Sequence, residues 1–356
     1  MDKNLKNKLI EKLEKFRIEE ISDSNIVMLP DFFVDHFLYL DDFEKEFERI
    51  KKIYGQGGGN APGVNQDIRQ GGNAANTSLA LARLGVNVDL ICRTSEFGKN
   101  LLDYFLGKHG VNLEKVKSDG ELAVTTAMEF GEKHVNVMVG DTGSVADFSF
   151  DRLDEEDLEK ISQSDIVGVM NWSLNRRGTD LAEKVFKYAK KRGVKTFFDT
   201  GDPAHRERDI PNLFENVISS KNLDIIGLNE NELKHYTGYD VFKDQNELID
   251  AAVSLKKRVS ARVDLHTCDL SCSIKNEGEK FYIPAVTLSS IKRATGAGDS
   301  WNAGNLFGEL AGLDDEERLL FANYFAACYI SDTRILHPDL EEVIDFIRKN
   351  ELKTIK

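Results

Sequence analysis

Near its carboxyl-terminal end the chain reads Ala294-Thr295-Gly296-Ala297-Gly298-Asp299-Ser300-Trp301-Asn302-Ala303-Gly304. Apolar residues then recur at the spacing of one helix face, so the two glycines mark the point where a loop becomes a helix. The first N–H groups of a helix have no partner inside it, and the helix dipole adds partial positive charge there. The turn is therefore predicted to hold an anion, for which phosphate is well suited.

The aspartate in this turn needs a reason to be there, because a carboxylate repels a phosphate. We interpret Asp299 as a general base, which takes a proton from a hydroxyl while the turn holds a phosphoryl group. The alternative is that Asp299 only complements the dipole of its own helix.

Composition places the chain among ordinary soluble proteins, with 356 residues of which 41% are hydrophobic and 30% charged. The formal net charge of -14 disfavours nucleic acid or an anionic membrane as a partner. The sequence contains no apolar run long enough for a transmembrane helix, and its start lacks the apolar core of a signal peptide. The four cysteines, at positions 92, 268, 272 and 328, lack the spacing of a zinc site and are predicted to be reduced thiols. We therefore expect a cytoplasmic protein.

The pattern along the chain predicts one α/β domain over residues 25–350, preceded by a helical extension over residues 1–24. Strands over 25–34, 87–92, 165–170, 194–199 and 224–228 alternate with helices, which favours a mainly parallel sheet covered on both faces. Three short strands within 260–284 are typical of an antiparallel edge. Residues 55–63 are rich in glycine and are expected to form a loop, and residues 121–139 are expected to form a hairpin that stands off the main layer.

Polar residues follow several of these strands, and in open α/β sheets ligands bind beyond the carboxyl ends of the strands. The candidates are Asp31, Asp35, Gly71 and Gly72 with Asn73 and Asn76, Asp199, Asn229 with Glu232, and the turn that contains Asp299. Taken alone, each has a structural explanation. Asn229 and Glu232 have the spacing of a helix cap, the paired glycines fit a tight turn, and Asp35 could close a strand.

In combination, the motifs resemble those of a known family. Residues 71–85, which begin Gly71-Gly72-Asn73-Ala74-Ala75-Asn76, and residues 295–299 resemble the two signatures of the ribokinase-like (PfkB) sugar kinases. The resemblance covers the chain from residue 25 onward. It implies a central, mostly parallel sheet flanked by helices and a small β lid, formed by about residues 36–70 and 121–140. It also implies a possible homodimer that pairs through the lid.

The resemblance implies a role for each matching position. Asp299 matches the catalytic base, and the anion hole is matched by Gly296, Ala297 and Gly298. The positions that hold the sugar hydroxyls are Asp35, Gly71, Gly72 and Asn76. Asn229 and Glu232 match the motif that organises Mg2+ through water. The implied reaction is Mg-dependent transfer of a phosphoryl group from ATP or ADP to a hydroxymethyl group of a sugar or sugar derivative.

The chain departs from the family pattern on the nucleotide side. Many relatives have an aspartate at the position of Arg293, where it helps to bind a monovalent cation. An arginine can replace the charge of that cation or contact a phosphate of the nucleotide, so we predict activity that does not depend on potassium. Residues 266–272 lack the glycines of the family's nucleotide-binding stretch, which leaves Thr267 as the nucleotide ligand in this segment and leaves ATP and ADP both open as donors.

The acceptor also stays open. Aromatic residues near Asp35, at positions 32, 33, 37 and 39, are suited to stack on a sugar or a nucleobase, or to pack in the core. Arg176, Arg177 and Arg206 could bind an acceptor phosphate, which would favour a sugar phosphate such as ribose 1-phosphate, or could form surface salt bridges. The candidates are thus a sugar kinase, a nucleoside kinase, a sugar-1-phosphate kinase and a non-catalytic sugar-binding relative. The sequence lacks a Gly-x-Gly-x-x-Gly motif after its first strand and a Gly-Lys-Ser/Thr loop, which disfavours a dinucleotide oxidoreductase and a P-loop enzyme.

Overall fold

A computed structural model describes residues 3–15, 21, 23–131, 135–276, 278–293 and 295–353. Ala294 of the glycine turn, His134 of the expected hairpin and parts of the expected extension (residues 1–2, 16–20 and 22) lie outside the described residues.

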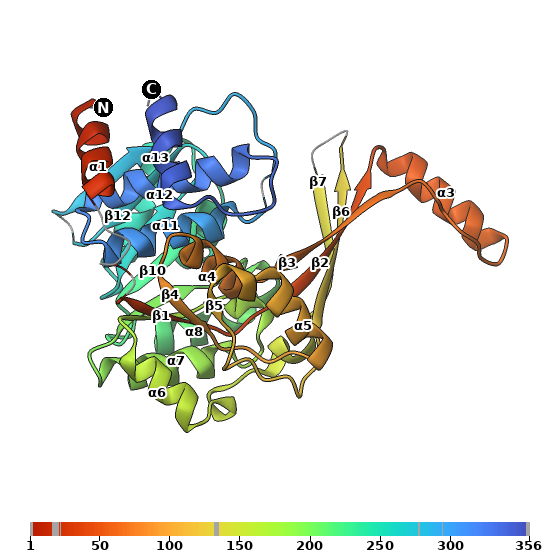
Figure 1. The fold of residues 1–356 in the computed structure, drawn as a ribbon, viewed down its shortest axis with the longest axis horizontal. Helices are drawn as coiled ribbons and strands as arrows, with labels where there is room; N and C mark the ends of the chain where they lie inside the picture. The colour runs from red at the N-terminus through yellow and green to blue at the C-terminus, as the bar shows by residue number, and fades with distance from the viewer. Residues whose placement is uncertain are drawn as a thin grey trace.

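A nine-stranded sheet forms the centre of the molecule (Figure 1), and its strand order is β13-β12-β11-β10-β9-β8-β1-β4-β5. The strands are β1 (Asn25–Leu29), β4 (Asn87–Leu90), β5 (Val111–Asn112), β8 (Ile166–Val169), β9 (Lys195–Asp199), β10 (Ile225–Asn229), β11 (Arg262–His266), β12 (Leu270–Ile274) and β13 (Lys280–Pro284). The ladders from β5 to β11 are parallel, and β12 and β13 pair antiparallel at one edge. The predicted parallel sheet with an antiparallel edge is confirmed.

Helices cover both faces of this sheet. Successive residues of β1 show the two layers, because Ile26 and Met28 belong to one hydrophobic cluster and Val27 and Leu29 to the other. The first cluster packs against α1 (Lys3–Lys15), α4 (Asn73–Arg83), α5 (Glu96–Phe105), α11 (Ala297–Leu310), α12 (Asp315–Ser331) and α13 (Leu340–Lys349). The second packs against α6 (Glu155–Gln163), α7 (Gly178–Lys190), α8 (Ile210–Leu213), α9 (Glu230–Thr237) and α10 (Gln245–Lys256).

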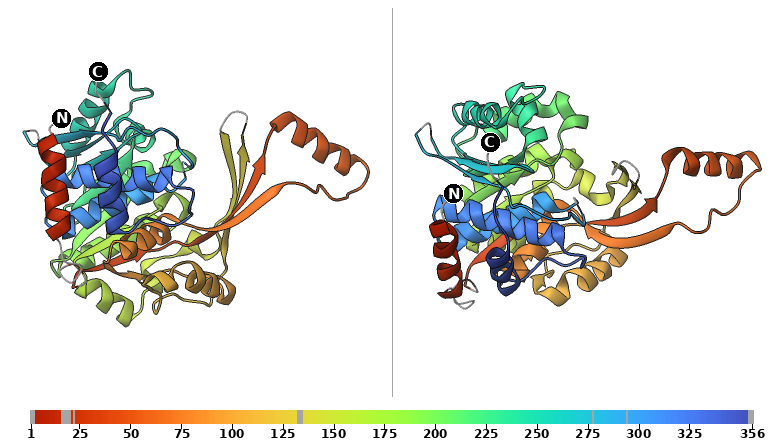
Figure 2. Two further views of the ribbon diagram at one scale, coloured as in Figure 1. Left: turned by 45° about the horizontal axis from the view of Figure 1, so that its top comes forward. Right: turned by 90° about the horizontal axis from the view of Figure 1, so that it is seen from above.

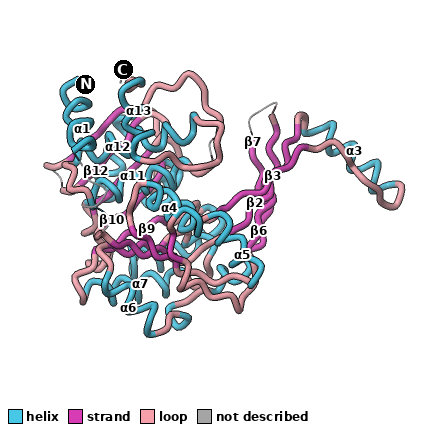
Figure 3. Tube along the Cα trace, viewed as in Figure 1, coloured by secondary structure: helices cyan, strands magenta, loops and turns pink. Residues whose placement is uncertain are grey.

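A second, four-stranded sheet stands off the body and forms the lid (Figures 1 and 3). Its order is β3-β2-β6-β7, from β2 (Phe33–Leu40), β3 (Asn65–Gly71), β6 (Ala123–Phe130) and β7 (Val135–Asp141). β2 runs parallel to β6, and the other two pairs are antiparallel. These strands fall on the two segments from which the resemblance derives a lid, but the first of them starts earlier, at Phe33.

The single strand predicted over residues 25–34 is wrong. The chain forms β1 in the main sheet, breaks at residues 30–32, and then enters the lid as β2. Pro30 has no N–H group to donate to a neighbouring strand, so a proline at this position disfavours a continuous strand. The break places Asp31 at the junction of body and lid.

The helix α3 (Phe43–Gly55), which the sequence pattern did not predict, projects at the far end of the lid (Figure 2). Its N-cap is Asp42, whose side chain accepts from the N–H of Lys45 at 2.8 Å. None of its residues is buried. The expected glycine-rich loop follows it and reaches β3.

The helix α1 packs on the body beside the carboxyl-terminal helices. Leu9 and Leu13 are buried, and Lys12 forms an ion pair with the buried Glu317 of α12 at 2.5 Å. None of the described helices has the length and apolar character needed to cross a membrane.

Candidate active site

The glycine turn lies where the sequence predicts it, at the start of α11. Gly296 is the N-cap, with φ +82°, a left-handed conformation that favours glycine. The N–H of Ser300 donates to the carbonyl of Gly296 at 3.0 Å, so the amides of residues 297–299 precede the first helical hydrogen bond. A Cβ on Gly298 would come within 3.2 Å of the His266 ring. Gly296, Ala297 and Gly298 thus form a turn with the geometry of an anion site.

Asp299 lies in the first turn of α11 and is 9% exposed. The Nδ2 group of Asn76, from α4, donates to its Oδ2 at 2.9 Å. Burial raises the pKa of Asp299 well above its usual value, the charges of Asp199 and Asp31 raise it further, and the bond from Asn76 opposes them. A carboxylate with a raised pKa accepts a proton more readily near neutral pH.

Asp35 lies on β2, and its carboxyl group rests directly on Gly71. A Cβ on Gly71 would lie 2.3 Å from Oδ2 of Asp35, and one on Gly72 would lie 3.1 Å from the carbonyl oxygen of Asp31. The two glycines therefore let β3 and the start of α4 approach these acids. Burial raises the pKa of Asp35 to about 6, and its charge contributes to the raised pKa of Asp299. The two carboxylates therefore lie close enough for their charges to interact.

Two further acids, which sequence analysis placed at strand ends without giving them a role, position the helices of the site. Asp31 is buried and accepts from the N–H of Asn73 at 3.0 Å and of Ala74 at 2.8 Å, at the start of α4. Asp199 accepts from Nδ2 of Asn302, in α11, at 2.6 Å. Each acid ties the end of a central strand to a helix that carries a site residue.

Asn229 and Glu232 form a reciprocal cap where β10 ends and α9 begins. Both carboxylate oxygens of Glu232 accept from Asn229, from its N–H at 3.0 Å and from its Nδ2 at 2.8 Å. Burial, together with the charge of Asp199, raises the pKa of Glu232 well above its usual value. Among the described residues no three His, Cys, Asp or Glu side chains are grouped to hold a metal ion directly. Mg2+ usually keeps several waters and takes only one or two carboxylates, so this pair fits a water-mediated role.

The two predicted nucleotide ligands, Thr267 and Arg293, form hydrogen bonds with other residues of the protein. The Thr267 hydroxyl accepts from the N–H groups of Asp269 and Leu270, each at 3.1 Å, in the turn between β11 and β12. Arg293 donates from Nη2 to the carbonyls of Asp332, at 2.7 Å, and Arg334. Contact of Thr267 and Arg293 with a nucleotide stays a prediction.

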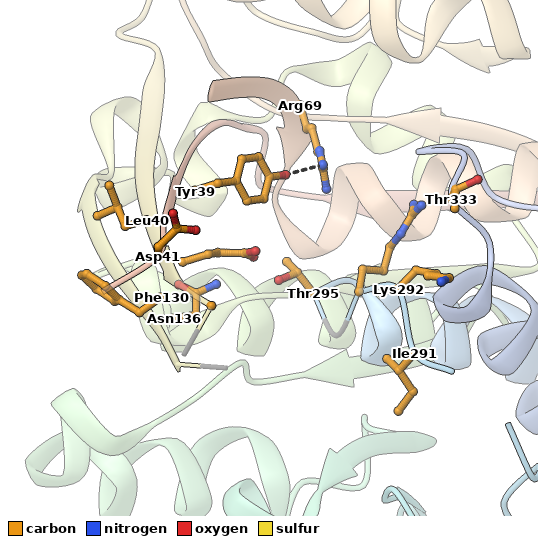
Figure 4. A pocket seen from close by; sticks show the side chains of 13 residues that line it. Tyr39, Leu40, Asp41, Arg69, Phe130, Asn136, Ile291, Lys292, Thr295 and Thr333 are labelled. Carbon is orange, nitrogen blue, oxygen red and sulfur yellow. Dashed lines mark hydrogen bonds between the residues drawn. The ribbon is translucent and has the colours of Figure 1, made fainter. Parts of the chain in front are cut away.

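A cavity of about 800 Å³ opens between the lid and the loop before the glycine turn (Figure 4). Its lining comes from both parts of the molecule, namely Tyr39, Leu40, Asp41, Arg69, Glu129, Phe130, Gly131 and Asn136 from the lid and Ile291, Lys292, Arg293, Thr295 and Thr333 from the body. The arginines singled out in the sequence are elsewhere. Arg176 pairs with Asp147 at 2.6 Å, and Arg206 lies over the Trp172 ring and donates to the Trp172 carbonyl.

Solved structures show the same fold. The structure of Arabidopsis thaliana ribokinase complexed with ribose and ATP matches with a TM-score of 0.73 and 21% identity, over 91% of this chain and 98% of that one. Adenosine kinase from Sinorhizobium meliloti matches with a TM-score of 0.71 and 19% identity, over 92% and 98%.

Curated sequences give the same family. A 5-dehydro-2-deoxygluconokinase of Clostridium perfringens is 25% identical over 291 residues, which are 79% of this chain and 84% of that protein. A ribokinase of Haemophilus influenzae is 26% identical over 290 residues, 80% of this chain and 89% of that protein. The model of the pfkB family of carbohydrate kinases matches residues 39–340. The chain therefore belongs to the pfkB carbohydrate kinase family and is a phosphotransferase with an alcohol group as acceptor.

Proposed function

We propose that this protein is an Mg-dependent kinase that transfers a phosphoryl group from a nucleotide to a hydroxymethyl group of a sugar or sugar derivative. The observation that carries the proposal is the placement of Asp299. Its carboxylate is buried, oriented by Asn76, and stands in the same helical turn as the free amides at the start of α11.

The proposed chemistry follows from these positions. Asp299 accepts the proton of the acceptor hydroxyl as the oxygen attacks the terminal phosphorus and the bond to the leaving nucleotide oxygen breaks. The amides at the glycine turn stabilise charge on the phosphoryl oxygens. Asp35 and the backbone at Gly71 and Gly72 orient the sugar hydroxyls, and the lid excludes water that would compete with the acceptor.

Magnesium, bound with the nucleotide, would neutralise phosphate charge. The carboxylate of Glu232 is the group on this chain that we propose to hold its water shell. Asn229 would keep Glu232 in place, because it donates to both carboxylate oxygens. We further propose that the β11–β12 turn at Thr267 contacts the nucleotide through its backbone, since the Thr267 hydroxyl is already used within the turn.

We favour ATP as the phosphoryl donor, because the matched Arabidopsis ribokinase structure is a complex with ribose and ATP. ADP remains the alternative donor. A nucleoside kinase is the second candidate for the acceptor, because the Tyr39 ring lines the cavity and stacks on Phe37 with 6.2 Å between ring centroids. An aromatic face exposed to a cavity suits a nucleobase as well as a sugar.

A panel of donors and acceptors tests the proposal. Sugars, sugar acids, sugar 1-phosphates and nucleosides are each incubated with ATP or ADP and Mg2+, and phosphorylated product is measured. We expect transfer to at least one acceptor and a loss of ~10²–10⁴-fold in turnover for Asp299→Asn, the usual scale for a general base. A protein that binds a sugar but transfers nothing to it would be the non-catalytic relative, and near-normal turnover of Asp299→Asn would remove Asp299 as the base.

We propose that the protein forms a homodimer through the outer face of the lid. Strand alternation places Ile68, Val137 and Val139 on the face opposite Asp35, and they are 57%, 40% and 59% exposed. The helix α3 adds an exposed apolar stripe of Phe43, Phe47, Ile50 and Tyr54. Light scattering after gel filtration tests this, since Val139→Lys should shift a dimer toward monomer without affecting the monomer fold.

We also propose a cytoplasmic location. All four cysteines are free thiols in the structure, which is usual for a reducing compartment. Fractionation of cells that express the protein tests this proposal.

A further inference from the structure

The cavity under the lid has cationic groups on both sides. Arg69 comes from the lid strand β3, and Lys292 and Arg293 come from the loop before the glycine turn. Arg69, Arg293 and Thr295 all line this cavity, and Figure 4 shows Arg69 and Thr295 among its lining side chains. Thr295 directly precedes Gly296, so the cavity adjoins the proposed transfer site.

The lid register places Arg69 next to the group that would hold the acceptor. Arg69 pairs with Asp35 across β2 and β3, so the two side chains share a face with their Cβ atoms ~4.5–5.5 Å apart. The acidic Glu129 pairs instead with Tyr39, four residues and ~13 Å further along β2. An acceptor that contacts Asp35 therefore meets Arg69 before it meets the acids at the lid tip.

Both guanidinium groups are held in place. Arg69 donates from Nε to Asp67 at 2.7 Å and from Nη2 to the Tyr39 hydroxyl at 2.6 Å, and it lies 4.6 Å from the centroid of the Phe37 ring. Arg293 is held by two backbone carbonyls of residues 332 and 334. A guanidinium carries five N–H donors in a fixed plane, so each arginine keeps donors for a ligand.

The other charged groups of the site are acidic, so the cations at the cavity indicate what kind of acceptor it binds. Five carboxylates, those of Asp31, Asp35, Asp199, Glu232 and Asp299, influence one another there, and the whole chain carries a net charge of -14. A neutral sugar needs no cation at the lid, because Asp35 and backbone groups can bind its hydroxyls. An anionic acceptor would be repelled by the acids unless a local positive charge offset them.

We infer that the acceptor is a sugar with an anionic group, a carboxylate or a phosphate, which lies between Arg69 and Arg293 while its free hydroxymethyl group faces Asp299. This inference rests on the proposed kinase function and names the substrate class of the same site. Carboxylate and phosphate share the planar, charge-assisted pairing that arginine provides, and the choice between them is an arm of the test.

Binding is measured first without nucleotide, by calorimetry. The anionic probes are gluconate, 5-dehydro-2-deoxygluconate and ribose 1-phosphate, and the neutral probes are ribose and fructose. We expect at least one anionic probe to bind more tightly than the neutral ones. Arg69→Gln should weaken that binding by about 10- to 100-fold, as for a hydrogen bond to a charged group, and Arg69→Lys should restore part of it.

Arg176→Gln is the matched control, because it removes an arginine whose carboxylate partner lies on the surface, away from the cavity. It should leave all affinities unchanged. The thermal transition of each variant shows whether it is folded. The inference is overturned if no anionic probe binds better than the neutral sugars, or if Arg69→Gln and Arg293→Gln weaken ATP binding and leave the acceptor affinity unchanged. The latter result would assign the cations to the nucleotide.

Kinetics separates this inference from the proposed function. Phosphoryl transfer to neutral sugars that is indifferent to Arg69→Gln supports the kinase and overturns the anionic acceptor. Arginine-dependent binding of an anionic probe with no transfer to any acceptor supports the anion site and overturns the kinase. When the protein is a kinase and its acceptor is anionic, Arg69→Gln raises the KM for the anionic acceptor and leaves the KM for ATP within about twofold.

Discussion

The contact between Gly71 and Asp35 gives a direct test of how the site holds its acceptor. A methyl group on residue 71 would stand 2.3 Å from Oδ2 of Asp35 and 2.4 Å from its Oδ1 and Cγ, whereas ordinary contact begins at 3.4 Å. In Gly71→Ala the carboxyl group must therefore move by about 1 Å. A misplacement of ~1 Å in a positioning group can cost ~10²-fold in rate. The residue that moves is a side chain with two rotatable bonds, so the fold should tolerate the change.

The assay is steady-state kinetics with the best acceptor and a saturating nucleotide. We expect kcat/KM for the acceptor to fall by ~10²-fold while the KM for the nucleotide stays unchanged. Gly140→Ala is the matched control, because it lies in the same lid sheet and its Cβ would find no atom closer than 3.8 Å. If Gly71→Ala keeps kcat/KM within twofold of the wild type, Asp35 does not position the acceptor and the reasoning is refuted.

Four further predictions concern charge. The rate should be the same in sodium and potassium buffers, because the guanidinium of Arg293, which donates to the carbonyls of residues 332 and 334, would take the place of the charge of a bound monovalent cation; a steep potassium dependence would contradict this. Acceptor kcat/KM should fall as pH drops below about 6, where Asp35 gains a proton, and this inflection should vanish in Asp35→Asn. Folding raises the pKa of Asp35 from 3.8 to about 6, so the folded protein binds this proton more tightly than the unfolded chain does. The resulting contribution to the free energy of unfolding is present below about pH 4 and is lost as pH rises to about 6. Asp35→Asn should therefore have a higher Tm than the wild type at pH 7 but not at pH 4. Glu232→Gln should raise the Mg2+ concentration needed for half-maximal rate, and an unchanged titration would leave Glu232 as a helix cap alone.

The parts of the site that could be predicted from sequence are local in the chain. A glycine turn that opens a helix is visible as a pattern of a few residues, since only the backbone conformation and the helix start are involved. The left-handed φ of Gly296 and the placement of Asp299 in the first turn of α11 agree with that pattern. The strand–helix alternation likewise predicted the parallel sheet, because parallel neighbours need helical crossovers.

The parts of the site that could not be predicted from the sequence depend on contacts between distant segments of the chain. The bond from Asn76 to Asp299 joins residues 223 positions apart, and contact of Asn76 with a sugar stays a prediction. The arginines after strands looked suited to an acceptor phosphate, but Arg206 is used inside the fold, and Arg69 on the lid reaches the cavity. Strand register and lid placement decide which cation reaches the site, and neither can be read from spacing.

The two sequence signatures act as one unit because each starts a helix and the two helices meet at the acids. The backbone amides that open α4 bind Asp31, and Nδ2 of Asn302 in α11 binds Asp199. Asn76 of α4 then donates to Asp299 of α11. A shift of either helix would therefore move Asp299 relative to Asp35. Asp31 and Asp199 therefore hold α4 and α11 in place, although each added carboxylate raises the pKa of the others.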